Sequence, residues 1–175
     1  DQAIEDFDLA IKLDPRNAAT IYNSRSHAYY EKRDYGRAIQ DLNQAIKLNP
    51  RYTLAIYNRG MAYRAKGEPE RAVPDFDLVL KITPNDAYVY HNRGLAYRDL
   101  RDYDRAIKDF DQAITLDAKS APAYVNRGVA YSVTGDAGRA LADYEKAIQI
   151  NATYAFAHYN RGNAYYDKGD YDRAI

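Results

Sequence analysis

Apolar residues recur along the chain at three- and four-residue steps, the spacing of one face of an α-helix. Between residues 87 and 100, apolar side chains at these steps predict one helix. After a break at 101–102, a second set predicts another helix; it comprises Tyr103, Ala106, Ile107, Phe110, Ala113, Ile114 and Leu116. The pattern therefore predicts two helices joined by a tight turn.

This pattern returns along the whole chain. The string Asn-Arg-Gly begins at Asn58, Asn92, Asn126 and Asn160, so successive copies are 34 residues apart. The same step links a tyrosine series and an alanine series, namely Tyr29, Tyr63, Tyr97, Tyr131 and Tyr165, and Ala38, Ala72, Ala106, Ala140 and Ala174. Because a helix pair recurs at a fixed period, the chain is predicted to be all-α and built from stacked pairs.

The residues between the helices favour the same division. An acidic residue precedes each second helix and is expected to cap it, at Asp34, Glu68, Asp102, Asp136 and Asp170. Gly67, Gly135 and Gly169 stand just before and suit a turn with positive φ. Prolines close several second helices, whereas Pro74 falls inside one and is expected to remove a hydrogen bond or cause a kink.

Glycines also recur inside the first helices, at Gly60, Gly94, Gly128 and Gly162. Gly costs ~1 kcal/mol relative to Ala in a helix, so its recurrence indicates a neighbouring helix pressed against the bare backbone. We expect the alanine series beginning at Ala38 to form the facing surface. Ser26 replaces the first glycine and is expected to loosen that contact.

The 34-residue period, with Gly then Tyr in the first helix, Ala-aromatic-Ala in the second and a closing Pro, resembles the tetratricopeptide repeat (TPR). The resemblance covers the whole chain and implies a right-handed superhelical α-solenoid of stacked helix-turn-helix repeats, whose first helices line a concave groove. It divides the single array 1–175 into a partial repeat at 1–18, full repeats at 19–52, 53–86, 87–120 and 121–154, and a partial repeat at 155–175.

Four asparagines form the candidate binding series, at Asn58, Asn92, Asn126 and Asn160. Asn is a mediocre helix residue, so its recurrence in mid-helix calls for a reason. In the TPR pattern these positions lie on the concave face, where carboxamides could pair with the peptide bonds of an extended ligand. This resembles the asparagine ladders of some TPR superhelices. The alternative is that the amides bond only to neighbouring helices or water.

Aromatic and basic residues are expected to line the groove around this series. The candidates are Tyr57, His91 and Tyr159, with Arg64 and Arg98 at one end of the helices. Tyr and Arg often carry interface energy, and the two arginines would suit an acidic or C-terminal ligand. The Lys positions of the family's chaperone-binding clamp hold Asn23, Tyr57, Tyr88 and His91, so a chaperone-tail role is not predicted.

A second polar series is expected to be structural. It pairs Arg25, Arg59, Arg93, Arg127 and Arg161 with Asp6, Asp41, Asp75, Asp109 and Asp143 as ion pairs between helices. Another arginine precedes the Asp by four residues, at Arg37, Arg71, Arg105 and Arg139, and is expected to compete for it. Buried pairs of this kind specify register more than they add stability.

Composition removes several classes of function. Lys plus Arg and Asp plus Glu are both 25, and this balance argues against a nucleic-acid partner or a polybasic membrane anchor. There is no Cys, the three His lack metal-ligand spacing, and no phosphate loop or nucleophile elbow occurs. We therefore predict no enzyme activity, no cofactor and no metal. No apolar run reaches the ~18 residues that span a bilayer, so a soluble segment is expected, with the cytoplasm as the default compartment.

The predicted function is a protein-interaction scaffold that holds an extended peptide or partner segment in its groove. Two alternatives are kept: a structural module that self-associates head to tail, and a recruiting arm of an enzyme whose catalytic domain is elsewhere. Self-association rests on the expected apolar face of Ala3, Ile4, Phe7, Ala10 and Ile11 at one end, and on incomplete cover of Tyr159, Ala164 and Tyr165 at the other.

Overall fold

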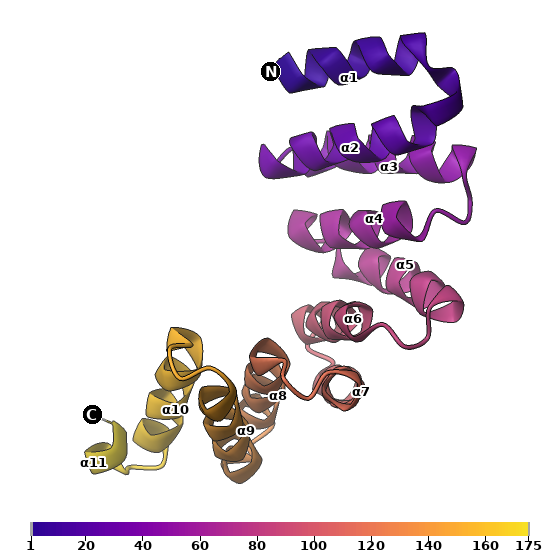
Figure 1. Ribbon diagram of the computed structural model, residues 1–175. Helices are drawn as coiled ribbons and strands as arrows, with labels where there is room; N and C mark the ends of the chain where they lie inside the picture. The colour runs from indigo at the N-terminus through magenta and orange to yellow at the C-terminus, as the bar shows by residue number, and fades with distance from the viewer. Residues whose placement is uncertain (1, 175) are drawn as a thin grey trace. The chain divides into compact units, whose positions relative to one another are not determined.

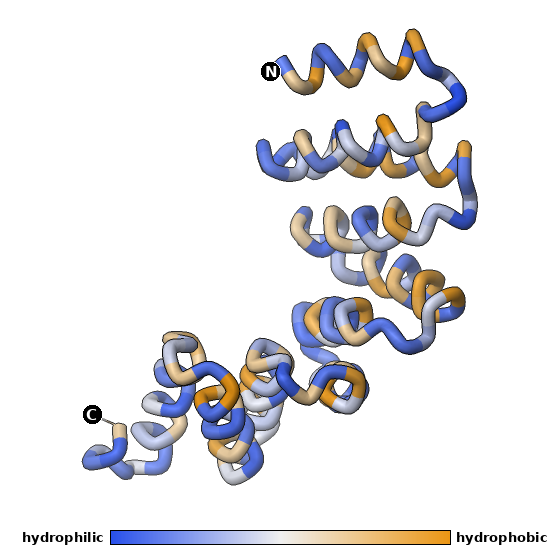
Figure 2. The backbone as a smooth tube through the Cα atoms, in the orientation of Figure 1, coloured by the Kyte–Doolittle hydropathy of each residue, from blue (hydrophilic) through white to orange (hydrophobic). Residues whose placement is uncertain are grey.

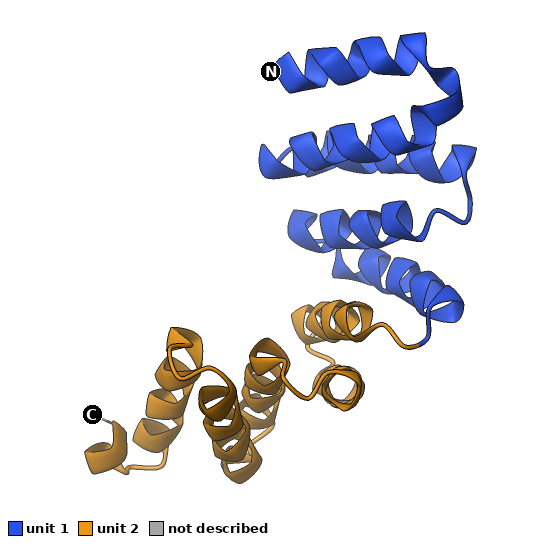
Figure 3. Ribbon diagram, viewed as in Figure 1, with its two compact units in different colours: residues 1–84 blue, residues 85–175 orange. Residues whose placement is uncertain are grey.

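The computed structural model describes residues 2–174, and every regular element in that range is a helix (Figure 1). Residues 1 and 175, which open the first predicted partial repeat and close the last, lie outside the described residues. The chain forms two compact units, 1–84 and 85–175 (Figure 3). The grouping of the helices into the six repeat ranges stays a prediction from the sequence.

The first unit contains five α-helices and one short 3₁₀ helix among its described residues. They are α1 (Gln2–Leu13), η1 (Pro15–Asn17), α2 (Ala18–Glu31), α3 (Tyr35–Leu48), α4 (Thr53–Lys66) and α5 (Pro69–Ile82). Helix α2 packs on α1 and α3, α4 packs on α3 and α5, and neighbours in the chain are neighbours in space. Helix α5 continues through Pro74, whose ring lies on the exposed face, so the missing N–H does not end the helix.

The second unit contains six α-helices among its described residues. They are α6 (Ala87–Asp99), α7 (Tyr103–Leu116), α8 (Ala121–Val133), α9 (Ala137–Ile150), α10 (Ala155–Asp167) and α11 (Tyr171–Ala174). Each helix packs on the next, and α8 also contacts α6 and α10. The all-helical fold of tandem helix pairs is thus confirmed, including the break at 101–102 predicted from the apolar pattern.

Each second helix buries one stripe and leaves the opposite face in solvent. In α7 the stripe is Ala106, Asp109, Phe110 and Ala113, and its members follow three-, one- and three-residue steps. The same stripe recurs in α9, where Tyr144 occupies the place of Phe110. Figure 2 shows apolar and polar positions alternating every few residues along the helices, which is the pattern expected when one face is buried. Burial of this stripe holds each second helix against the first helices beside it.

Three of the four glycines inside the first helices face aromatic rings, so the expected alanine surface is wrong as their main contact; a Cβ on the fourth, Gly162, would lie 3.6 Å from the Ala174 carbonyl. A Cβ placed on Gly60 would lie 2.9 Å from the ring of Phe76, and one on Gly94 would lie 2.8 Å from Phe110. At Gly128 the nearest atom belongs to Tyr144, at 2.6 Å, although the carbonyl of Ala140 follows at 3.2 Å. Ala38, Ala72, Ala106 and Ala140 are fully buried, but the ring is the large group that occupies the space of the missing side chain.

The turns between paired helices follow the predicted chemistry with one exception. Gly67, Gly135 and Gly169 have positive φ, and the Asp caps accept the amide N–H three residues on. At Asp136 that amide bond, followed by the Arg139 guanidinium, lowers the pKa of the carboxyl. The prediction for Glu68 is wrong, because its longer side chain bonds Lys66 and Arg71 instead of capping α5.

Two turns hold a positive φ without glycine, and this leads to a stability prediction. Arg101 has φ 61°, where the next turn has Gly135 at 87°. A left-handed conformation costs a residue with a Cβ about 1–2 kcal/mol. Arg101→Gly is therefore expected to raise the free energy of unfolding by about 1 kcal/mol, after the greater freedom of Gly in the unfolded chain is subtracted. Denaturant unfolding followed by helical circular dichroism measures the change.

The reciprocal variant serves as its control. Gly135→Arg places a Cβ at the same turn position and is expected to destabilise by a similar amount, although nothing within 4 Å would clash with that Cβ. A neutral or destabilising Arg101→Gly, together with a neutral Gly135→Arg, would show that backbone strain at this turn has no energetic consequence.

Candidate binding surfaces of the first helices

The orientation of the first helices is set by buried arginine–aspartate pairs. In α4, Arg59 donates through Nε and Nη2 to the two carboxylate oxygens of Asp75 in α5, at 2.8 and 2.6 Å. The same bidentate geometry joins three more pairs: Arg25 with Asp41, Arg93 with Asp109, and Arg127 with Asp143. The predicted ion pairs between helices are present at these positions. Asp6 and Arg161 are exceptions: the Asp6 carboxylate accepts from Gln2, and Arg161 makes no such pair among the described residues.

Three of these arginines, Arg25, Arg59 and Arg127, also reach back to the preceding second helix, a contact that sequence reasoning missed. Arg127 donates through Nη1 to Asp111 of α7 at 2.6 Å, and Arg59 donates to Asn43 of α3 at 2.8 Å. Arg25 bonds Asp8 of α1 in the same way. A signal existed, because positions 8, 43 and 111 each follow a member of the aspartate series, Asp6, Asp41 or Asp109, by the same two-residue step. The arginine therefore links three helices and limits rotation of the first helix between them.

The other arginine series does not compete for the buried aspartates, so that expectation is wrong. Arg105 donates through Nε to its own cap residue Asp102 at 2.6 Å and lies 4.4 Å from the ring centre of Tyr97. The same cation–π geometry is present at Arg37 over Tyr29, Arg71 over Tyr63 and Arg139 over Tyr131. The cap residue Asp102 lies three residues before Arg105, whereas the buried Asp109 lies four residues after it, in the opposite direction along the helix. These arginines therefore cover the tyrosine series.

In the first unit the candidate residues lie on α4, where they face α2. The Asn58 carboxamide donates through Nδ2 to Asn23 Oδ1 of α2 at 2.9 Å. Tyr57 lies beside the Phe76 ring, with the ring centres 5.8 Å apart. Burial raises the pKa of the Tyr30 phenol, and the positive charge of Arg64 on α4 opposes that rise. The Asn58 amide thus joins neighbouring first helices.

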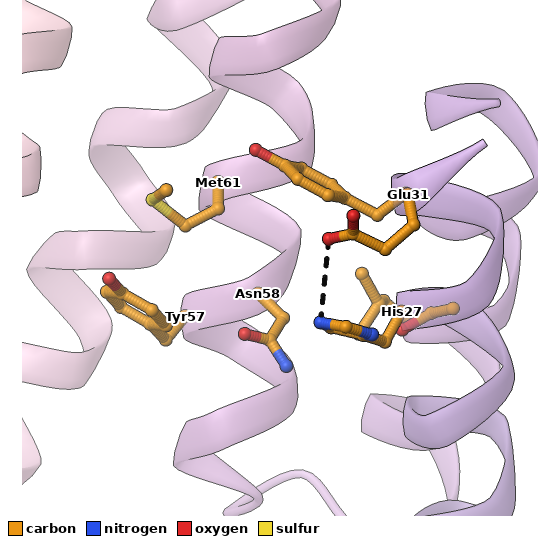
Figure 4. A pocket seen from close by; sticks show the side chains of 8 residues that line it. His27, Glu31, Tyr57, Asn58 and Met61 are labelled. Carbon is orange, nitrogen blue, oxygen red and sulfur yellow. Dashed lines mark ion pairs between the residues drawn. The ribbon is translucent and has the colours of Figure 1, made fainter. Parts of the chain in front are cut away.

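A pocket of about 150 Å³ opens between α2 and α4. Its wall is mainly apolar, with Tyr30, Leu42 and Met61 beside Tyr57. Figure 4 shows the polar part of the wall: Asn58 of α4 and His27 of α2 point toward each other, and His27 Nε2 lies 3.8 Å from a carboxylate oxygen of Glu31. The pocket combines an apolar interior with polar groups, the composition that suits recognition of a side chain.

In the second unit three candidates converge on one amide. Asn126 Nδ2 lies 3.0 Å from His91 Nε2 of α6 and also donates to the Pro122 carbonyl at 2.9 Å. Its Oδ1 accepts from Arg98 Nη1 at 2.8 Å. The structure thus brings His91, Arg98 and Asn126 together. His91 takes the place that Asn23 has in the first unit: His91 lies 35 residues before Asn126, and Asn23 lies 35 residues before Asn58.

The remaining asparagines bond their own helix. Asn92 is buried, and its Nδ2 donates to the Tyr88 carbonyl at 2.8 Å, whereas Asn160 donates to the Phe156 carbonyl at 2.7 Å. Ligand contact by the asparagine series therefore stays a hypothesis. Each of the four amides has at least one hydrogen bond within the chain, and the alternative interpretation stays a prediction as well.

Large aromatic side chains remain exposed on the first helices of the second unit. Tyr88 on α6 is 76% exposed and Tyr159 on α10 is 64% exposed. Tyr159 stacks on Phe156, with ring centres 6.5 Å apart and the planes inclined by 22°. By contrast, Ala164 and Tyr165 are buried, so their predicted incomplete cover is wrong: Arg173 lies 4.6 Å from the Tyr165 ring centre. Exposed, preordered rings are the surface type that contributes most at protein interfaces.

The described part of the chain contains neither a cluster of metal-ligating side chains nor a helix that could cross a membrane. Among residues 2–174, no three His, Asp or Glu side chains are grouped so that they could hold a metal ion. None of the described helices is both long enough and apolar enough to cross a membrane. Within the same range, every buried side-chain nitrogen and oxygen has a hydrogen-bond partner.

Comparison with known proteins identifies the family. Models described as tetratricopeptide repeat match residues 23–87 and 87–120, and one described as TPR repeat matches 134–169. The chain therefore belongs to the tetratricopeptide repeat family. No curated protein sequence matches it significantly.

Solved structures share the fold over most of the chain. A crystal structure of MamA has 27% identity and a TM-score of 0.78, covering 85% of this chain and 87% of its own. MamA from Desulfovibrio magneticus RS-1 has 22% identity and a TM-score of 0.82, covering 90% and 89%. YrrB, described as a TPR protein with an unusual peptide-binding site, has 20% identity and a TM-score of 0.74, covering 97% and 87%. The TPR fold typically serves as a non-catalytic scaffold for protein interactions, and these repeats support that general role here.

Proposed function

We propose that this chain binds an extended segment of a partner protein along the first helices of its units and that it has no catalytic activity. The observation that carries the proposal is the exposure of Tyr88 and Tyr159 on the first helices α6 and α10. Helix α6 is held on α7 by the Arg93–Asp109 pair, and α10 packs on α9. A rigid helix that presents an exposed ring loses little conformational entropy when the ring is covered by a partner.

Polar groups beside the rings supply directional contacts for a partner backbone. The Asn160 carboxamide lies one residue from Tyr159 on α10 and uses its N–H toward Phe156, so its Oδ1 is available as an acceptor. Asn58, Asn92 and Asn126 would contribute through the hydrogen-bonding capacity that their contacts within the chain leave over. Arg64 and Arg98 would favour an acidic group or a terminal carboxylate on the partner. YrrB, which shares the fold, is described as having a peptide-binding site.

A capture experiment tests this function. The parent chain and a Tyr88→Ala, Tyr159→Ala variant are used to retain proteins from a native lysate. We expect partners held by the parent to be lost by the variant, since truncation of a tyrosine that is a hot spot of an interface costs about 2 kcal/mol or more, roughly thirtyfold in Kd. The matched control is Leu48→Ala, Leu78→Ala, which removes exposed apolar side chains from the second helices α3 and α5. Equal retention by all three chains would contradict the proposal.

Self-association through α1 is a separate proposal. No residue of α1 is buried, and Leu9 and Leu13 are exposed, although packing on α2 leaves Ile4, Phe7, Ala10 and Ile11 half-buried. Light scattering over a range of protein concentrations tests it: a mass that rises with concentration supports association through apolar ends, and a constant monomer mass removes it.

A further inference from the structure

The pocket between α2 and α4 lies where one helix pair departs from the others. In three pairs a glycine of the first helix faces an aromatic ring of the second: Gly60 with Phe76, Gly94 with Phe110, and Gly128 with Tyr144. In the α2–α3 pair, Ser26 and Leu42 occupy the corresponding positions, and both are fully buried. The first pair therefore has a smaller side chain in place of the ring.

The ring matters because it reaches the groove-facing side chains of its own pair. Phe76 lies 5.8 Å from Tyr57 and Phe110 lies 5.7 Å from His91, measured between ring centres. Leu42 has no ring to extend in this direction and instead lines the open pocket. The Ser26 hydroxyl donates its hydrogen bond to the Asn23 carbonyl at 2.6 Å, so an apolar group bound in the pocket does not leave that donor without a partner. The interior is thus apolar and accessible.

The volume and the charge at this site point to a particular occupant. A cavity of about 150 Å³ lined by apolar groups is large enough for a benzene molecule, which is close to the size of a leucine side chain. Glu31 lines the same pocket, is exposed, and has His27 as its ionic neighbour at 3.8 Å. A Lys or Arg, which carries a full charge, is a stronger partner for this carboxylate than a histidine ring.

We propose that this pocket takes one leucine-sized apolar side chain from an extended partner segment and that Glu31 pairs with a Lys or Arg two residues away from it. Side chains two residues apart in an extended segment point to the same side and lie about 7 Å apart. The inference rests on the proposed function, because it names the kind of segment that the first helices of this unit select.

The test uses a display library of random peptides about 12 residues long, which span roughly 40 Å when extended. Peptides are selected on the parent chain and their affinities are then measured on variants. Ser26→Gly with Leu42→Phe fills the pocket with the glycine–ring arrangement of the neighbouring pairs, so the variant has a packing precedent within the same chain. Thermal unfolding confirms that it is folded. Glu31→Lys, at an exposed position, provides a second variant that leaves the core untouched.

We expect the selected peptides to share an apolar residue and a Lys or Arg two positions away. Filling the pocket is expected to weaken their binding at least tenfold, and Glu31→Lys to weaken basic peptides while sparing variants with the basic residue replaced by Gln. Peptides that lack this pattern and bind the filled variant as well as the parent would overturn the pocket proposal but leave peptide binding intact. Failure to select any peptide on the parent chain would overturn both the pocket proposal and the proposed function.

Discussion

Asp143→Ala is expected to lower the free energy of unfolding of the second unit by about 3–5 kcal/mol, the typical cost of removing one member of a buried ion pair. The carboxylate of Asp143 is 7% exposed and accepts two hydrogen bonds from Arg127, whose side chain is 19% exposed. Loss of the carboxylate leaves a guanidinium between packed helices with two donors unpaired. Denaturant unfolding followed by helical circular dichroism measures the change.

The same arginine offers a matched control. Asp111 bonds the third donor of Arg127, but its side chain is 49% exposed, so water can replace it. Asp111→Ala is expected to cost less than about 1 kcal/mol, as for other exposed ion pairs. If both alanine variants were equally mild, the buried pairs would not be what holds the first helices in their register.

Phe110→Ala is the second change with a large expected effect, a loss of about 3–5 kcal/mol in the same unfolding experiment. The ring is fully buried in α7 and covers the bare backbone at Gly94 of α6. Its removal takes apolar surface out of the core and leaves a cavity between the two helices. The loss should therefore exceed the transfer free energy of the ring alone.

A compensating substitution separates the ring–glycine contact from burial in general. Gly94→Leu alone is expected to destabilise, because even its Cβ would lie 2.8 Å from the Phe110 ring. Combined with Phe110→Ala it is expected to fill part of the cavity, so the double variant should be more stable than the sum of the single effects implies. Strict additivity of the two effects would contradict the assignment of Phe110 as the partner of Gly94.

The helices and turns of this fold could be predicted because their signals are local. Gly135 and Asp136 specify a turn and a cap within a few residues, and both behave as their chemistry predicts. The capping prediction was wrong for Glu68, which occupies the same position, because its side chain has one more methylene group and bonds Lys66 and Arg71 instead. Arg101 shows that a turn closed by the hydrogen bond from the Asp102 N–H to the Tyr97 carbonyl can hold a positive φ where the residue type disfavours it.

Contacts between helices were harder to predict, because periodicity shows which residues recur but not which of them meet. The arginine and aspartate series were recognised, yet the third contact of Arg127 to Asp111 requires the register of two successive second helices. Likewise, the glycine series indicated a close approach but did not distinguish the buried alanines from the ring of Phe110.

The candidate site was predictable in position and not in detail. Asn126 does lie on a first helix beside His91 and Arg98, as the repeat pattern indicated. What the pattern did not show is that its amide is already bonded within the chain. The pocket between α2 and α4 could not be predicted either. It requires both Leu42 and Ser26 at their positions, whereas the sequence indicated only that Ser26 would loosen a contact.

The most direct test of the central claim is a nuclear magnetic resonance titration of the isotope-labelled chain with a peptide selected on it. We expect the backbone amide shifts to change mainly on first helices, namely α2 and α4 in the first unit and α6, α8 and α10 in the second, beside Tyr57, Tyr88 and Tyr159. Shifts confined to the second helices α3, α5, α7 and α9, or to α1, would contradict binding on the first-helix faces.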